Sequence, residues 1–187
     1  DVKGLIDLGY LVSARSYAVP VDLSNVKTKG NDYEQSSLSD FYDDNSLYTG
    51  AVDNYIKHAN GTKALLFCSG VKNSIKIRDQ FRAAGITAEH LDAENVSKAD
   101  RESILARFDR GEFRVLCNVG ILTTGYDCPS IETVILYRAT KSLALFLQMC
   151  GRGSRLFKNK DYFRVLDFGN NFNTHGLWEA PREWSLS

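Results

Sequence analysis

Short apolar runs alternate with amphipathic stretches along the chain from Lys63 onward. The runs are mostly apolar, which is typical of strands that are buried on both faces of a parallel sheet. Five strands are predicted on this basis, at 64–68, 87–91, 114–117, 133–137 and 163–166. Strands that alternate with helices build a parallel sheet with helices on both faces. The pattern therefore predicts an α/β domain over residues 63–169.

Helical spacing fills the intervals between these strands. Residues 71–84 carry apolar side chains near a helical period and stop before Gly85, which suits the left-handed turn after a helix. A second helix is predicted over residues 97–110, with Ser97 as its N-cap. A third is expected to begin near residue 140 and to carry a cluster of polar and glycine residues at its end.

The two ends of the chain have a different character. Asn, Asp, Ser and Lys are spread through residues 22–45 with only weak periodicity. Residues 1–62 are therefore predicted to be a partly helical linker from a preceding domain, and the start at Asp1 without a methionine suggests an excised piece. Its expected contents are a helix, an extended stretch and a second helix, at 2–8, 16–21 and 47–59. Residues 170–187, with two tryptophans, are expected to pack back on the domain.

Composition limits the classes of partner and location. The chain has 187 residues, and its 23 Lys and Arg residues balance 23 Asp and Glu residues. No global positive field attracts nucleic acid, so any such contact must be local. The four cysteines are widely spaced, which favours reduced thiols in a cytosolic protein and no metal site. No apolar run approaches the ~20 residues of a membrane span. We expect a cytoplasmic location.

The most informative stretch runs from Gln148 to Arg155. Arg152 and Arg155 lie one helical turn apart and can converge on one anion. The planar guanidinium stays charged and matches phosphate oxygens at two points. Glycines at 151 and 153 leave room for a phosphate or another backbone to approach. On spacing alone, a solvated basic helix end is an equally good interpretation.

A second candidate is the loop over residues 122–129, just after the strand that ends near Cys117. Ligands of open parallel sheets bind beyond the carboxyl ends of strands. The hydroxyls of Thr123 and Thr124 can donate to phosphate oxygens, and Asp127 can accept from a sugar hydroxyl. A turn chosen for its Gly, Asp and Pro residues is the commoner reading of this stretch taken alone.

Two weaker candidates remain. Ser69, at the end of the first core strand, can touch a nucleic-acid phosphate, although a helix-capping role is favoured by about two to one. His90, Asp92 and Glu94 suggest a metal site or an acid–base pair. A solvated strand end is the favoured explanation of these three residues.

In this order, the motifs resemble the C-terminal helicase domain of superfamily 2 motors, over roughly residues 63–169. Phe67-Cys68-Ser69 falls at motif IV, Thr124-Gly125-Tyr126-Asp127 matches motif V, and Gln148-x-x-Gly151-Arg152-x-x-Arg155 matches motif VI. The details look closest to the RadD-like branch of bacterial and phage DEAD/DEAH-type proteins. That closer similarity includes residues 81–90, 122–127, 148–156 and 166–170, and more weakly the opening segment.

The resemblance implies a RecA-like fold and the role of second motor domain in an ATP-dependent helicase or translocase. Arg155, as the arginine finger, and Arg152 would then reach the terminal phosphate of ATP across a cleft between two domains. Gln148 would contact the phosphate or the attacking water. The resemblance also assigns Gly125, Asp127 and Gly151 to the nucleotide, and Ser69, Thr123 and Thr124 to the nucleic-acid backbone. Expected partners are the N-terminal RecA-like domain, single-stranded DNA or RNA, and DNA repair proteins near the bacterial or phage-infected nucleoid.

Departures from the family pattern limit this picture. The sequence has no Gly-x-x-x-x-Gly-Lys-Ser/Thr loop and no Asp-Glu-Ala-Asp/His box. ATP and Mg²⁺ are therefore expected to be held mainly by the N-terminal domain, and this chain alone is expected not to hydrolyse ATP. Val119 stands where many family members carry a hydroxyl. Two alternatives stay open: a duplex DNA translocase subunit of a restriction or repair system, and a non-catalytic RecA-like module that binds nucleic acid or a partner.

Overall fold

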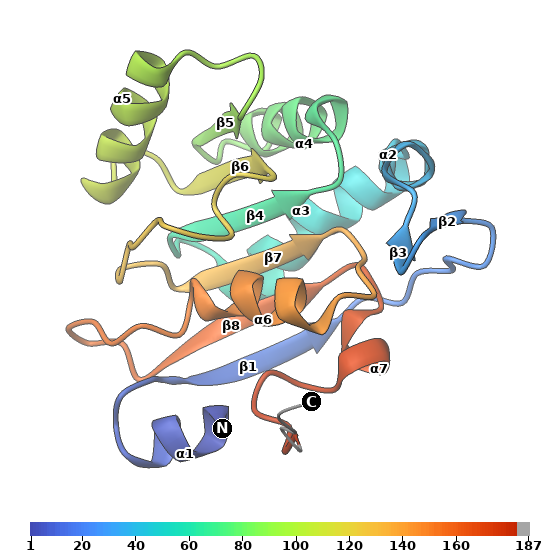
Figure 1. The fold of residues 1–187 in the computed structure, drawn as a ribbon. Coiled ribbons are helices and arrows are strands. Elements are labelled where there is room, and N and C mark those ends of the chain that lie inside the picture. Colours follow the sequence, from blue (N-terminus) through green and yellow to red (C-terminus); the bar gives the residue numbers. More distant parts are fainter. Residues whose placement is uncertain (183–187) are drawn as a thin grey trace.

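A computed structural model describes residues 1–182 and contains a six-stranded sheet in the order β1-β8-β7-β4-β6-β5 (Figure 1). Each neighbouring pair of strands is parallel. The strands are β1 (Ser13–Ala18), β4 (Ala64–Cys68), β5 (Ala88–Asp92), β6 (Val115–Val119), β7 (Thr133–Tyr137) and β8 (Tyr162–Asp167). The helices are α1 (Val2–Asp7), α2 (Gln35–Tyr42), α3 (Asn45–Ala59), α4 (Val71–Ala83), α5 (Lys98–Asp109), α6 (Leu143–Gly151) and α7 (Asn171–His175). The predicted α/β fold is confirmed.

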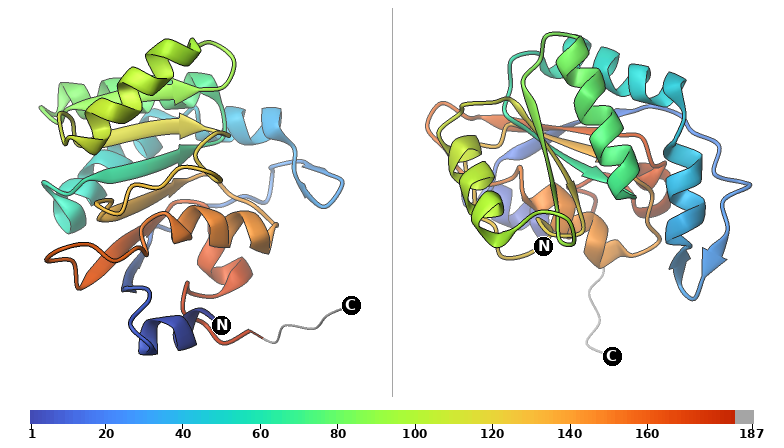
Figure 2. Two further views of the ribbon diagram at one scale, coloured as in Figure 1. Left: turned by 60° about the vertical axis from the view of Figure 1, so that its left-hand side comes forward. Right: turned by 90° about the horizontal axis from the view of Figure 1, so that it is seen from above.

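Helices cover both faces of the sheet (Figure 2). Successive side chains of a strand point to opposite faces, so each central strand supplies both cores. In β4, Leu66 and Cys68 pack with α2, α3 and α4, whereas Leu65 and Phe67 pack with α5 and α6. All five β4 residues are buried, which is why the strand reads as a continuous apolar run.

The N-terminal region adds structure that the apolar pattern did not indicate. β1 pairs with β8 from Ser13 opposite Tyr162 to Ala18 opposite Asp167, so the region expected to be a linker supplies an edge strand of the sheet. A small antiparallel pair, β2 (Thr28–Lys29) and β3 (Asp32–Tyr33), precedes α2. The α2 helix is anchored by Tyr42, whose buried hydroxyl donates to the Phe168 carbonyl at 2.7 Å. The domain boundaries themselves stay a prediction.

After β8 the chain turns around a buried carboxylate. Asp167 accepts hydrogen bonds from the backbone N–H groups of Gly169 and Phe172, each at 2.9 Å, and so fixes the start of α7. Trp178 is buried beside Phe163, with ring centroids 6.3 Å apart. The last part of the expected tail, including Trp184, lies outside the described residues.

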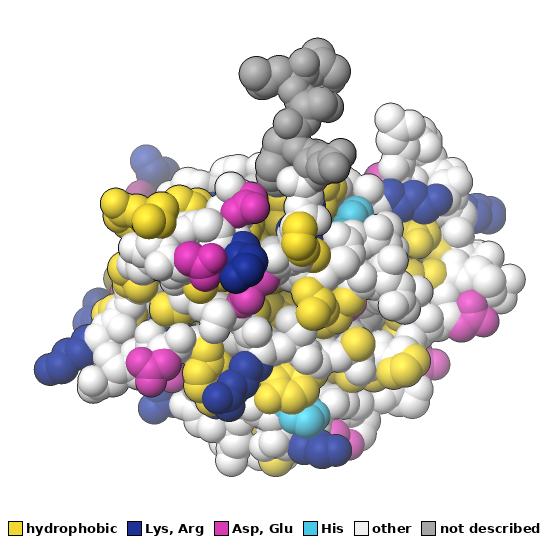
Figure 3. All heavy atoms as spheres, turned by 90° about the horizontal axis from the view of Figure 1, so that it is seen from below, with side chains coloured by type: hydrophobic (Ala, Val, Ile, Leu, Met, Phe, Trp, Pro, Cys, Tyr) yellow, Lys and Arg dark blue, Asp and Glu magenta, His cyan; other side chains and the backbone are white. Residues whose placement is uncertain are grey.

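Charges are mixed on the face shown in Figure 3, where Lys and Arg side chains are interspersed with acidic and hydrophobic ones. This agrees with the balanced composition and leaves local clusters as the places where an anion can bind. The four cysteines are buried free thiols. Within residues 1–182, no helix combines the length and apolar character that crossing a membrane requires.

Candidate functional site

The first component of the site is the end of α6. The Ser142 hydroxyl caps the helix by accepting from the Leu145 N–H at 3.2 Å. Phe146, Met149 and Cys150 anchor the helix in the core, while Gln148 is exposed. Because the apolar side is fixed, the chain beyond Gly151 leaves the helix in a defined direction.

Two contacts set the path of the segment that carries the arginines. A Cβ atom at Gly153 would overlap the ring of Phe163, so this glycine is required by packing inside the domain and not by the approach of a ligand. Next, the Val12 N–H donates to the Ser154 carbonyl at 2.9 Å, and Leu11 forms an antiparallel bridge with Arg155. The N-terminal segment thus holds the backbone of the predicted arginine finger.

The second component is the long loop between β6 and β7. It leaves the carboxyl end of β6 and returns to the amino end of β7, bringing Asp127 beside Arg155. The expectation that Asp127 lies at the carboxyl edge of the sheet is therefore wrong, since Arg155 bridges to a residue that precedes β1. Tyr126 fastens the loop to the end of α5 by donating to Asp109 at 2.6 Å.

Arg152 and Arg155 converge on this loop. Arg155 donates from Nε and Nη2 to the two carboxylate oxygens of Asp127, at 3.1 and 3.2 Å. Arg152 donates from Nη1 to the Tyr126 carbonyl, and its buried Nε has no partner among residues 1–182. Burial lowers the pKa of Arg152, with Asp127 opposing and Arg155 adding to the shift. A guanidinium keeps its charge under such perturbation.

A pocket of about 510 Å³ lies between these groups. Among the residues predicted for the site, those that line it are Gly125, Asp127, Gln148, Gly151, Arg152 and Arg155. The structure thus brings together the residues expected at the phosphates and at the nucleotide. The arrangement offers two guanidinium groups, one carboxylate and one amide to a ligand, a set suited to a polyphosphate with a sugar.

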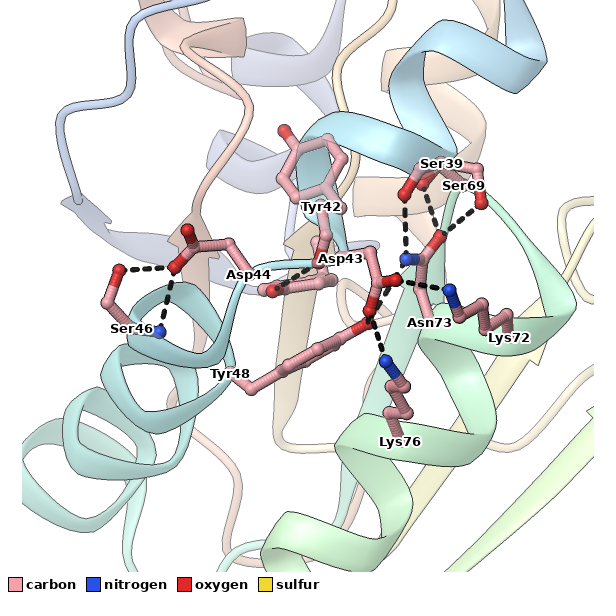
Figure 4. Close-up of polar contacts among 11 residues, drawn as sticks. Ser39, Tyr42, Asp43, Asp44, Ser46, Tyr48, Ser69, Lys72, Asn73 and Lys76 are labelled. Carbon is pink, nitrogen blue, oxygen red and sulfur yellow. Dashed lines mark hydrogen bonds and ion pairs between the residues drawn. The ribbon is translucent and has the colours of Figure 1, made fainter.

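The residues expected to contact nucleic acid do not line this pocket. Thr124 is exposed and Thr123 half-buried in the loop after β6, and Thr124 directly precedes Gly125, which does line the pocket. Ser69 is fully buried and donates to Asn73 at 3.1 Å (Figure 4). Ser39 of α2 covers the start of α4, so the Ser69 hydroxyl faces protein in this conformation.

The group of His90, Asp92 and Glu94 also differs from expectation. His90 and Asp92 are buried, so a solvated strand end does not describe them. The imidazole bridges Ser74 and Asp92, with both contacts at 2.7 Å. Asp92 in turn accepts from the backbone N–H of Glu94 at 2.8 Å. In the described part of the chain, no three His, Cys, Asp or Glu side chains are grouped as metal ligands. These residues tie β5 to α4 and to the following loop.

Comparison with protein-family profiles shows which family the chain belongs to. Residues 48–156 match the profile described as the helicase conserved C-terminal domain. The chain belongs to this helicase family. The match includes the loop and the helix end that line the arginine pocket, whereas Leu11 lies outside it. The helicase C-terminal domain of superfamily 2 is thus the framework of the site, while the closer similarity to the RadD-like branch stays a prediction.

Relatives of this helicase domain are longer proteins. A "51.5 kDa protein" of a Lactococcus phage (isolate 7-9) is 35% identical over 184 residues, which cover 98% of this chain and 40% of the relative. "Putative ATP-dependent helicase IRC3" of Saccharomyces cerevisiae is 31% identical over 169 residues, or 88% of this chain and 24% of that protein. The chain thus spans well under half of the relatives that it matches.

Solved structures support the same fold. The C-terminal domain of the DEAD-box protein Dbp5 superposes with a TM-score of 0.57 at 17% identity, covering 70% of this chain and 76% of that one. A Type ISP restriction-modification enzyme, LlaBIII bound to DNA, gives a TM-score of 0.62 at 18% identity and covers 88% of this chain and 12% of that one. At these identities the likeness concerns the fold alone.

Sequence reasoning missed several residues around the site. Leu11 belongs to the opening segment, and nothing in the local sequence predicts its bridge to Arg155. Lys72 and Lys76 form ion pairs with Asp43, which lies directly after α2 (Figure 4). The spacing of the two lysines on one helix face was the available signal, but their partner lies far away in the sequence.

Proposed function

We propose that this domain is the second motor domain of an ATP-dependent helicase or translocase, and that Arg155 and Arg152 bind the terminal phosphates of ATP held by an N-terminal domain. The observation that carries the proposal is the convergence of both guanidinium groups on one pocket with Asp127 and Gln148. Phosphoryl transfer depends mainly on positioning and on neutralising charge, which arginines supply.

The exposure of the Arg155–Asp127 ion pair suggests how a phosphate can replace Asp127 on Arg155. Both side chains are more than half exposed, at 55% and 56%, so their attraction is weakened by solvent. A polyphosphate presents more negative charge than one carboxylate and can replace Asp127 on Arg155. Asp127 is then free to accept from a ribose hydroxyl, while Arg152 keeps its bond to the Tyr126 carbonyl. Closure of the two domains would therefore depend on bound ATP.

The proposal places Mg²⁺ in the N-terminal domain and not in this one. The lining supplies a single carboxylate, Asp127, which the proposal directs to Arg155 or to the ribose, and the other lining groups are cationic, amide, hydroxyl or apolar. Divalent magnesium prefers carboxylates together with phosphate oxygens. We assign it to the N-terminal domain, where it would neutralise charge on the β- and γ-phosphates.

We propose that nucleic acid contacts the end of the sheet where β6 ends and α4 begins, away from Arg155. Thr123 and Thr124 lie in the loop after β6, and Lys72 and Lys76 lie in the first turns of α4. Hydroxyl and ammonium groups bind phosphate oxygens without reading bases, so we expect low sequence specificity and salt-sensitive affinity. Single-stranded DNA and RNA are both to be tested.

The test measures ATP hydrolysis by the longer protein that joins this domain to its N-terminal partner, with and without single-stranded DNA or RNA. Arg155→Ala should lower the stimulated rate by roughly 10³-fold or more, as for a lost arginine finger. Arg155→Lys should recover only part of the loss because an ammonium lacks the planar fork. Lys57→Ala, at an exposed position of α3, is the matched control and should leave the rate unchanged.

Two outcomes oppose the proposal. If the longer protein hydrolyses no ATP with any nucleic acid, the motor role fails and the non-catalytic module takes its place. If it hydrolyses ATP and Arg155→Ala leaves the rate intact, the motor role stands and the assignment of Arg155 fails.

A further inference from the structure

A second pocket lies on the other side of Asp127 from the arginines. Its volume is about 610 Å³, and its walls come from the end of α5 and from the segments before β4, β6, β7 and β8. Asp127 is the lining residue that the two pockets share. The pocket is therefore adjacent to the arginine site but built from different side chains.

Two lysine residues that are largely buried line this pocket. Lys63 is 6% exposed and Lys160 is 9% exposed. Lys63 Nζ donates to the Asp109 carbonyl at 3.0 Å and to the Ser130 hydroxyl at 2.8 Å, and Lys160 Nζ donates to the Pro129 carbonyl at 2.9 Å. Every acceptor that these ammonium groups reach among residues 1–182 is thus neutral. Both lysines are thus largely buried in the protein, and in residues 1–182 neither ammonium group contacts a carboxylate.

Such an arrangement is costly unless an anion completes it. A buried charge loses favourable hydration, and neutral acceptors recover only part of this. Burial lowers the pKa of Lys160 to about 8, although Glu132 acts in the opposite direction. The carboxylate of Glu132 accepts instead from the backbone N–H of Lys63 at 3.1 Å. A positive charge that is paired only with neutral acceptors, beside an open cavity, favours binding of an anion in that cavity.

The rim of the pocket reinforces this preference. Arg114 and Lys158 are exposed and add positive charge. Of the acidic groups, Asp109 accepts from Tyr126 and Asp127 is held by Arg155, so neither is directed at the two lysines. Phe157 is 52% exposed and lines the same cavity. An aromatic ring beside cations is a suitable surface for a nucleobase above its phosphate.

We propose that this pocket binds a phosphate group, with the phosphoryl oxygens on Lys63 and Lys160 and any attached base against Phe157. The chemistry is that of inorganic phosphate or of a phosphomonoester, such as a nucleoside monophosphate or the 5′-phosphate end of a strand. This site is distinct from the arginines proposed to bind ATP, and it does not depend on ATP hydrolysis.

The test is an NMR titration of the 187-residue chain with inorganic phosphate, with AMP, and with a short oligothymidylate carrying or lacking a 5′-phosphate. Saturable shifts are expected in the backbone amides of Gly111, Ser130 and Lys160, and the oligonucleotide should act only when phosphorylated. If AMP binds more tightly than phosphate and Phe157→Ala removes the difference, the source is a nucleotide. Equal affinities instead assign the site to free phosphate.

Variants decide whether the lysines carry the binding. Lys160→Met keeps the aliphatic length and should weaken phosphate at least about tenfold, since a hydrogen bond to a charged group is lost. Should that variant fail to fold, Arg114→Ala and Lys158→Ala, both at exposed positions, should each weaken binding roughly threefold. Lys98→Ala, whose side chain is 90% exposed on α5, is the control for charge alone.

Three results would overturn the proposal. The first is the absence of shifts in these amides at millimolar ligand. The second is shifts confined to the segment of Arg152 and Arg155, which would place the anion in the neighbouring pocket. The third is equal weakening by Lys98→Ala and Lys158→Ala, which would show that the ligand responds only to net charge. None of these results bears on ATP hydrolysis by the longer protein.

Discussion

Arg155 and Asp127 form a two-point ion pair, with Nε–Oδ1 and Nη2–Oδ2 distances of 3.1 and 3.2 Å. The pair joins the segment after α6 to the loop between β6 and β7. Its geometry fixes the plane of the guanidinium, while its exposure leaves the interaction screened by water. It orients the arginine without holding it tightly.

Asp127→Asn should therefore change the free energy of unfolding by less than about 1 kcal/mol, as is usual for exposed ion pairs. Urea denaturation followed by circular dichroism measures this directly. Glu102→Gln, which removes the exposed Lys98–Glu102 pair, gives the reference for a surface charge. A loss of several kcal/mol in Asp127→Asn alone would show that the pair is a structural latch and would argue against its exchange for phosphate.

Gly151 and Gly153 should respond in opposite ways to substitution by alanine. A Cβ at Gly153 meets the Phe163 ring at overlapping distance, and overpacking of this kind costs about 1–3 kcal/mol. At Gly151, a Cβ would lie 3.7 Å from Trp178, an ordinary contact, and alanine favours the helix end by up to about 1 kcal/mol. Urea unfolding of both variants tests the contrast. Equal effects would mean that the Phe163 ring moves aside.

The sequence predicts an element well when most of its residues are buried, and poorly when the element lies at the edge of the sheet or is half-exposed. β4 and β7 were predictable because both of their faces are buried, and their apolar sequences show this directly. β1 was not assigned to the sheet because it lies at an edge and none of its residues Ser13–Ala18 is fully buried, so its sequence shows no apolar run. α2 escaped prediction for a similar reason, since only Leu38 and Tyr42 of its residues are buried.

Motif order identified the arginines, but their surroundings depend on tertiary packing. Arg155 and Asp127 are far apart in the sequence and meet only because the loop after β6 crosses to the amino ends of the strands. Lys63 and Lys160 are more distant still, and nothing in their local sequence indicates that both are buried beside one pocket. Burial of a charged residue is set by the strands that meet around it, so such a site becomes visible only in the fold.

Asp43 should make stability depend on pH in the acid range. Hydrogen bonds from Lys72, and then from Lys76, lower the pKa of Asp43 from 3.8 to about 2. A carboxylate with a lowered folded pKa stabilises the protein above its unfolded value, and this contribution is lost as pH falls from about 4 toward 2. The difference in unfolding free energy between the native chain and Asp43→Asn should be constant above pH 4 and should shrink below it.

Urea unfolding at a series of pH values, while the chain is still folded, measures that difference. Asp44→Asn is not a suitable control because Asp44 caps α3, so Asp53→Asn, at an exposed position of that helix, is used instead. A difference that stays constant down to pH 2.5 would contradict the assigned contact between Asp43 and the lysines.

His90 should produce a second pH dependence, near neutrality. Burial lowers the pKa of this imidazole from 6.5, Asp92 opposes the shift, and Arg78 adds to it. The unfolded chain therefore binds the proton more readily than the folded chain does. The contribution of neutral His90 to the free energy of unfolding is therefore complete above about pH 6.5, and it is lost as the pH falls toward the pKa of the folded state. Comparison of the native chain with His90→Gln between pH 7.5 and 5 should show a difference that shrinks on acidification, because His58 and His175 are common to both. NMR titration of the His90 ring should give a midpoint below 6.5, and a midpoint above 6.5 would mean that the ion pair with Asp92 outweighs burial.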